Sequence, residues 1–170
     1  MIMGFWMLHG AESSLPYLTG WVLKSLTKAR VGHLATSTRE GIPLVVPICF
    51  ALGVKAIFSA IDQKSKRMKP LALRRVRNIV ENQNVCLTVD EYDEDWRKLR
   101  YVMVQATATL LTRGGEHRAA LSLLREKYRQ YRHMDLESRP IIKIKPLRII
   151  AWKATPSLPP SKTVKPKEYP

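Results

Sequence analysis

The stretch from residue 31 to residue 60 restricts the possible folds more than any other part of the sequence. It consists of three short apolar, β-branched runs, VGHLATST, PLVVPICFAL and AIFSA, separated by turns at Gly41 and Gly53. Such runs predict three successive strands. Parallel neighbours need a crossover of a dozen residues or more, and these turns are far shorter. We therefore expect antiparallel strands, which excludes a doubly wound parallel sheet.

Three more strands are predicted further along the chain. They correspond to NVCLTVD, to YVMVQATATLLT and to a last run from about Ile141 to Ala154, bent at Pro146. In the fifth strand every second residue is expected to face inward, namely Val102, Val104, Ala106, Ala108 and Leu110. The order of elements predicts a mainly β protein with flanking helices, built on a small six-stranded antiparallel barrel.

Three helices are predicted from apolar residues at helical spacing. The first involves Leu15, Leu18, Val22 and Leu26. The second runs through the most basic tract of the chain and buries Met68, Ala72, Val76, Ile79 and Val80 beneath a cationic surface. The third involves Leu121, Leu124, Tyr128 and Tyr131.

The length of 170 residues and a hydrophobic content of 45% predict a single soluble globular domain. We place it at residues 13–155, after an N-terminal lead of residues 1–12 and before a Pro/Lys-rich extended tail of residues 156–170. Two cysteines, Cys49 and Cys86, form no disulfide framework, and neither an export signal nor an apolar run of about 18 residues is seen. We expect a cytoplasmic protein without a membrane span.

The net charge of +15, from 29 Lys and Arg against 14 Asp and Glu, predicts a polyanionic partner. Nucleic acid, a phosphorylated cofactor and an anionic membrane surface all attract this sign of charge. The motifs GxxxxGK[ST] and GxGxxG are absent, and neither the histidines nor the cysteines have metal-ligand spacing. The sequence assigns no metal site and no catalytic side chain. The positive charge instead predicts a binding site for an anion.

The basic tract begins where the third predicted strand ends. Lys64, Ser65, Lys66 and Arg67 follow Ser59-Ala60-Ile61-Asp62-Gln63 and open the second helix. Backbone N–H groups and the positive end of a helix dipole favour a phosphate at such a junction. A solvated helix face is the alternative, and both interpretations stay open.

Two other features have a functional and a structural interpretation. The acidic run DEYDEDW, residues 90–96, could form a wall beside a ring or a solvated loop that balances the basic helix, and charge alone favours the loop. His33 could face a cofactor, but a half-buried histidine with satisfied hydrogen bonds is the favoured interpretation.

Residues 29 to 154 resemble the pyridoxamine 5'-phosphate oxidase-like FMN-binding split-barrel superfamily. The similarity is greatest to the branch of F-420-dependent (deazaflavin) enzymes, in which a K-x-K-R segment, an R-x-x-N-I helix and a V-D-x-Y-x-x-D-W turn occur in this order. This sequence has KSKR from Lys64, RVRNI from Arg75 and VDEYDEDW from Val89.

The resemblance implies a six-stranded Greek-key split barrel that forms a homodimer and holds FMN or F-420 at the subunit interface. By carry-over, the cofactor phosphate would be bound by Lys64, Ser65, Lys66 and Arg67. The tricyclic ring would lie against the main chain of Val46, Pro47 and Ile48, with Ser59 nearby. The partner subunit would supply a wall from Trp96, Arg100 and Tyr101.

The resemblance does not extend to a substrate. The R-L-x-R-x-R-type segment of true pyridoxamine phosphate oxidases is missing, so pyridoxamine phosphate is a poor substrate hypothesis. The positive charge suits the polyglutamate tail of F-420, but the same cations would satisfy an FMN phosphate.

Three functions follow, in this order. The first is an FMN- or F-420-dependent oxidoreductase that transfers hydride to or from an unknown small molecule. The second is a binding protein on the same barrel that holds a flavin, haem or another tetrapyrrole without turnover. The third is a nucleic-acid-binding barrel, although the tract from Lys64 to Arg77 contains no aromatic residue for base stacking.

Overall fold

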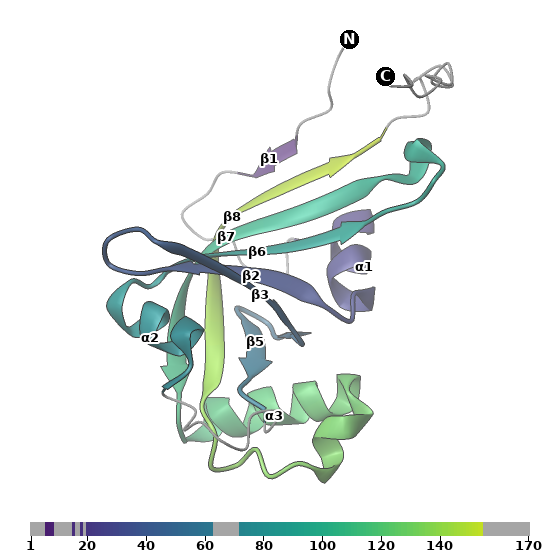
Figure 1. Ribbon diagram of the computed structural model, residues 1–170. Coiled ribbons are helices and arrows are strands. Elements are labelled where there is room, and N and C mark those ends of the chain that lie inside the picture. Colours follow the sequence, from purple (N-terminus) through teal and green to yellow (C-terminus); the bar gives the residue numbers. More distant parts are fainter. Residues whose placement is uncertain (1–5, 9–14, 16–17, 19, 63–71, 155–170) are drawn as a thin grey trace, which may run out of the picture.

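The protein is mainly β, with helices at the margins of one antiparallel sheet (Figure 1). The computed structural model describes residues 6–8, 15, 18, 20–62 and 72–154. The strands are β1 (Trp6–Leu8), β2 (Gly32–Ser37), β3 (Pro43–Ile48), β4 (Ala51–Leu52), β5 (Ile57–Ala60), β6 (Asn84–Glu91), β7 (Arg100–Leu111) and β8 (Ile141–Lys153). The helices are α1 (Gly20–Lys28), α2 (Arg74–Glu81) and α3 (Gly115–Lys127), with the 3₁₀ turns η3 (Trp96–Lys98) and η4 (Arg129–His133).

The sheet curls into a half-barrel because its two ends are consecutive in the chain. The strand order is β3-β2-β6-β7-β8-β5-β4, so β3 and β4 lie at opposite ends. Only Cys49 and Phe50 separate them in sequence. Three residue steps reach no more than about 11 Å, so the sheet must bend until its ends approach each other.

The prediction of a mainly β, antiparallel protein is confirmed, but the expected six strands are wrong. Seven strands form the continuous path, and β1 pairs separately with β8 among the described residues. The predicted second strand is two strands, because its first half pairs with β2 and its second half pairs with β5. The strand at residues 6–8, within the predicted N-terminal lead, was not expected from the sequence.

The barrel core follows the predicted alternation along β7. Val102, Val104, Ala106 and Ala108 are buried, whereas Leu110 is only partly buried. The pairing of β7 with β8 shifts register between Gln105 and Ala106, opposite Pro146. Proline cannot donate to the ladder, so a bulge at this bend agrees with the predicted kink.

The helices agree with the predictions in type but differ in their bounds. α1 begins at Gly20, later than expected, although Leu15 and Leu18 are still buried. In α2, Val76 and Ile79 are buried but Val80 is 69% exposed, so its predicted place on the buried face is wrong. Val80 lies about 100° round the helix from Ile79, away from the face that packs on the sheet.

α3 and η4 close the lower end of the sheet and pack against β4 and β5 (Figure 1). The predicted apolar face of this region is buried throughout, but α3 ends at Lys127 and the chain continues into η4. Tyr128 and Tyr131 therefore belong to the turn after the helix. Among the described helices, none is long and apolar enough to cross a membrane.

Candidate functional site

The strand predicted to lie along a cofactor ring is an edge strand. β3 is first in the strand order, and its described pairing is with β2 alone. Its side chains alternate, with Val46 and Ile48 turned toward the core and Pro47 exposed. Pro43 and Pro47 have no N–H group, so at these positions the backbone offers a ligand only a carbonyl oxygen.

A cavity of about 230 Å³ opens where β3 ends. Cys49, the residue after β3, contributes to its wall, and so does Asp62, which lies two residues after β5. The rest of the lining comes from Arg30, Val31, Tyr128, Gln130, Tyr131 and Met134. The fold thus brings Cys49, which follows the predicted ring strand, and Asp62, two positions before Lys64 in the sequence, to one cavity.

Tyr128 connects two segments beside this cavity through hydrogen bonds of its hydroxyl group. Its hydroxyl accepts a hydrogen bond from the amide nitrogen of Phe50 at 3.0 Å. The same hydroxyl lies 2.9 Å from the carbonyl oxygens of Phe50 and Arg30, either of which can accept its proton. One side chain therefore fixes the β3–β4 connection to the segment that leads into β2.

Two cations lie beside the cavity. The guanidinium of Arg30 lies 4.5 Å from the centroid of the Tyr128 ring and donates to the carbonyl oxygen of Lys127. The ammonium of Lys127 lies 4.2 Å from the centroid of the Phe50 ring. Burial, with a smaller contribution from the charge of Arg30, lowers the pKa of Lys127 to about 8. Burial and the neighbouring Cys49 raise the pKa of Tyr131 well above its ordinary value.

The predicted phosphate-binding residues Lys64, Ser65, Lys66 and Arg67 lie outside the described residues. Ser59 is 2% exposed and pairs with Ile142 in the sheet. It does not line the cavity.

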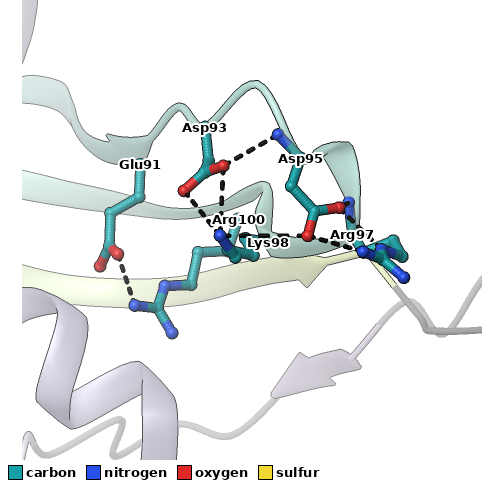
Figure 2. A network of polar contacts seen from close by, with 6 residues as sticks. All are labelled: Glu91, Asp93, Asp95, Arg97, Lys98 and Arg100. Atoms are coloured by element: carbon teal, nitrogen blue, oxygen red, sulfur yellow. Dashed lines mark hydrogen bonds and ion pairs between the residues drawn. The ribbon is translucent and has the colours of Figure 1, made fainter.

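The acidic run covers the last two residues of β6 and most of the connection to β7 (Figure 2). Asp95 accepts hydrogen bonds from the backbone nitrogen of Arg97 and, at 2.7 and 3.0 Å, from its guanidinium. The Lys98 ammonium lies 3.4 Å from Asp93, and Arg100 is bonded to Glu91. In the described chain these three acids thus pair with cations of their own hairpin.

The hydrogen bonds in this hairpin lower the pKa values of two of its acids, Glu91 and Asp95. The bond from Arg100 is the main reason that the pKa of Glu91 is lowered, and Ser25 adds a second bond at 3.2 Å. The bond from Arg97 is the main reason that the pKa of Asp95 is lowered. Both carboxylates therefore remain charged near neutral pH.

Of the three residues predicted to form the partner wall, one lines a second cavity. Arg100 contributes to a hollow of about 400 Å³ at the β6–β7 hairpin, whereas Trp96 and Tyr101 are not part of its lining, and Trp96 is 61% exposed. Tyr101 stacks on Trp152 with ring centroids 5.8 Å apart. The two cavities share no lining residue.

His33 lies on β2 with about half of its side chain accessible. The side chain is 53% exposed, and Nδ1 lies 3.8 Å from the Asp90 carboxylate, an ion-pair distance that is too long for a hydrogen bond. Within the described part of the chain, no three His, Cys, Asp or Glu residues are grouped as metal ligands.

Comparison with known proteins agrees with this architecture. A FAD-binding protein from Mesorhizobium loti has a TM-score of 0.60 at 22% identity, over 90% of this chain and 100% of that one. An F420 reductase has a TM-score of 0.55 at 21% identity, over 78% and 98%. HutZ, the haem storage protein of Vibrio cholerae, has a TM-score of 0.56 at 18% identity, over 70% and 82%. At these identities the similarity concerns the fold.

No curated protein sequence matches the chain. The sequence profile described as pyridoxamine 5'-phosphate oxidase, however, matches residues 19–153, which include every described element from α1 to β8. A match over most of the chain, together with the curled antiparallel sheet, shows that this protein belongs to the pyridoxamine 5'-phosphate oxidase-like split-barrel family.

Proposed function

We propose that this protein is an oxidoreductase that binds FMN or F-420 at the interface of a homodimer. The observation that carries the proposal is the cavity between Cys49 and Asp62. It lies where β3 ends and a few residues before Lys64, although β3 and β5 are far apart in the strand order. A ring placed along β3 would thus have its phosphate within reach of the basic segment.

The described residues suit a planar, anionic cofactor. The open edge of β3 offers carbonyl oxygens, and Val45, which is 58% exposed, gives it an apolar surface. Arg30 and Lys127 contribute positive charge nearby. Family membership and the similarity in fold to a FAD-binding protein and an F420 reductase support a flavin-type cofactor.

The chain's own residues would bind and orient the cofactor. Lys64, Ser65, Lys66 and Arg67 would hold the phosphate, and Val46, Pro47 and Ile48 would position the ring through the main chain. A bound flavin or deazaflavin supplies the hydride chemistry, so no side-chain nucleophile is needed. Trp96, Arg100 and Tyr101 of a second copy would cover the ring from the other side.

Two measurements test this function. Purified protein is titrated with FMN and with F-420 by fluorescence, and the reduced complex is then mixed with a panel of acceptors. The proposal predicts saturable binding and oxidation of the reduced cofactor that depends on an acceptor. Saturable binding without acceptor-dependent oxidation would indicate a flavin- or deazaflavin-binding protein, and no binding of FMN or F-420 would exclude both of these roles.

Haem binding is a second candidate because of His33. A metal-binding histidine commonly donates its other ring N–H to a carboxylate, and Asp90 lies close to Nδ1 of this exposed ring. HutZ, a haem storage protein, has a similar fold. This candidate predicts a Soret shift when haem is added and loss of that shift in His33→Ala. An unchanged spectrum in His33→Ala would remove this role.

We further propose that the protein is cytoplasmic. Both described cysteines, Cys49 and Cys86, are free thiols, which suits a reducing compartment. Fractionation of cells that produce the tagged protein would test this. Recovery in a secreted or membrane fraction would contradict it.

A further inference from the structure

We infer that the cavity between Arg30 and Tyr131 binds the substrate of the proposed oxidoreductase, and that this substrate is a small carboxylate with a flat apolar body. The inference rests on the proposed function, because it assigns the cavity to the molecule that meets the cofactor ring. It concerns a part of the site to which the sequence drew no attention.

The size of the cavity favours a compact ligand. Its volume of about 230 Å³ is below the roughly 300–1,000 Å³ of pockets that take drug-sized ligands. A whole flavin cofactor is drug-sized or larger. Because Cys49 directly follows the predicted ring strand, a compact ligand in this cavity would lie next to a ring on β3.

Arg30 is the group that selects a carboxylate. Among the described residues, no carboxylate lies within ion-pair distance of its guanidinium. The side chain is nonetheless held, by stacking on Tyr128 and by one hydrogen bond to the Lys127 carbonyl. That bond uses one of the five N–H donors of the guanidinium. An arginine that is fixed in position and has further donors can bind a planar carboxylate through two parallel hydrogen bonds.

Apart from the polar side chains of Asp62 and Gln130, the other walls favour an apolar, flat body, with the carboxylate of the ligand turned to Arg30 and away from Asp62. Tyr128 and Tyr131 contribute rings whose centroids are 5.4 Å apart and tilted by 50°. Val31 and Met134 add aliphatic and thioether surface. Aromatic and methionine side chains pack well against a planar ring. A small aromatic carboxylate combines this body with the anionic group that Arg30 would recognise.

Cys49 provides a direct reporter, because it lines the cavity and Cys86 does not. The experiment measures the alkylation rate of each cysteine by iodoacetamide, read by peptide mass spectrometry, in protein without cofactor. Benzoate is the probe, and benzamide is its neutral counterpart of the same shape. At ten times its Kd, benzoate should slow Cys49 alkylation about tenfold and leave Cys86 unchanged. Benzamide should protect weakly or not at all.

Substitution of Arg30 separates charge recognition from simple filling of the cavity. Arg30→Gln should weaken benzoate protection about tenfold or more, because charge-assisted hydrogen bonds are lost. Arg129→Gln, which removes an exposed cation of the neighbouring turn, should keep the protection. Each rate is taken as a ratio with and without probe, which cancels any change in the intrinsic reactivity of Cys49.

Equal protection by benzoate and benzamide, or full protection in Arg30→Gln, would overturn the inference. So would FMN or F-420 that binds, protects Cys49 and excludes benzoate, because the cavity would then belong to the cofactor. That outcome would leave the proposed function intact. Failure of the cofactor titration with intact benzoate protection would instead remove the proposed function and the substrate role, and leave a carboxylate-binding cavity.

Discussion

The hydroxyl of Tyr128 lies within hydrogen-bond distance of both backbone groups of Phe50, at 3.0 Å from its nitrogen and 2.9 Å from its oxygen. Phe50 is fully buried between β3 and β4, where the chain passes from one end of the sheet to the other. Buried backbone groups need partners, and Tyr128 supplies one at this position. The contact therefore holds the β3–β4 connection in place beside the cavity that Tyr128 lines.

Tyr128→Phe should destabilise the protein by about 1–3 kcal/mol, because it leaves the buried N–H group of Phe50 without its partner. The free energy of unfolding from urea titration measures the change. Tyr92→Phe, at a ring that is 69% exposed, is the matched control and should change little. Equal effects of the two substitutions would contradict the role of Tyr128.

Gly32→Ala should destabilise the protein by about 1–3 kcal/mol through overpacking. A Cβ at Gly32 would lie 2.8 Å from Cδ1 of Leu87 and 3.1 Å from the ring of Phe50. Gly115→Ala is the control, because a Cβ there meets nothing within 4 Å and the residue lies in α3. Thermal and urea unfolding should show that Gly32→Ala is less stable than Gly115→Ala. Similar stabilities of the two variants would show that the side chains around Phe50 can rearrange to accommodate the added methyl group.

The charge of Lys127 should make stability depend on pH in one window. Its folded-state pKa, lowered from 10.5 to about 8 mainly by burial, means that the unfolded chain keeps this proton at pH values where the native state has lost it. Stability therefore rises with pH between about 8 and 10.5, and this contribution is absent below that range.

The measurement compares wild type with Lys127→Met by urea unfolding at pH 7, 8, 9 and 10. The free energy of unfolding of wild type, relative to that of Lys127→Met, should increase as the pH rises from about 8 to 10.5. Arg30→Gln should reduce the slope, because the charge of Arg30 is the second cause of the lowered pKa. A difference independent of pH would show that the ammonium is not titrating in this window.

The sequence predicted the strands well because their signals are local. Alternation along β7 and the short turns after β2 and β4 set strand type and direction without knowledge of the partner. It could not show that residues 43–52 divide into β3 and β4, because both halves are equally apolar. The division arises from their different partners, and the sequence does not contain that information locally.

Some features of the candidate site could also be predicted from the sequence, and others could not. The sequence placed Val46, Pro47 and Ile48 on a strand, but it did not show that this strand lies at the edge of the sheet, and Arg30 and Tyr128 were missed. Tyr128 was expected in the core by its spacing, which gave no sign that its hydroxyl bonds Phe50, 78 positions away in the chain. The sequence analysis also did not identify the partners of the DEYDEDW run, which are Arg97, Lys98 and Arg100 directly after it.

A site shared between two subunits predicts complementation. Lys64→Ala with Lys66→Ala removes the phosphate side, and Trp96→Ala removes part of the proposed partner wall. Each variant alone should bind the cofactor weakly. Unfolding and refolding an equal mixture should restore about a quarter of the tight sites, because random pairing makes half of the dimers mixed and each mixed dimer has one intact site. Titration that finds no tight sites in the mixture would contradict a shared site.

The most direct test of phosphate binding by the basic segment is the cofactor affinity of the Lys64→Ala, Lys66→Ala variant. The affinity for FMN and for F-420 is measured by fluorescence titration alongside wild type and a control that carries Lys55→Ala and Lys145→Ala, two exposed lysines outside the tract. Wild type and control should bind one of the two cofactors tightly, and the variant should lose about 1–5 kcal/mol of binding free energy because two charge-assisted hydrogen bonds are removed. Unchanged affinity in the variant would contradict phosphate binding by the basic segment.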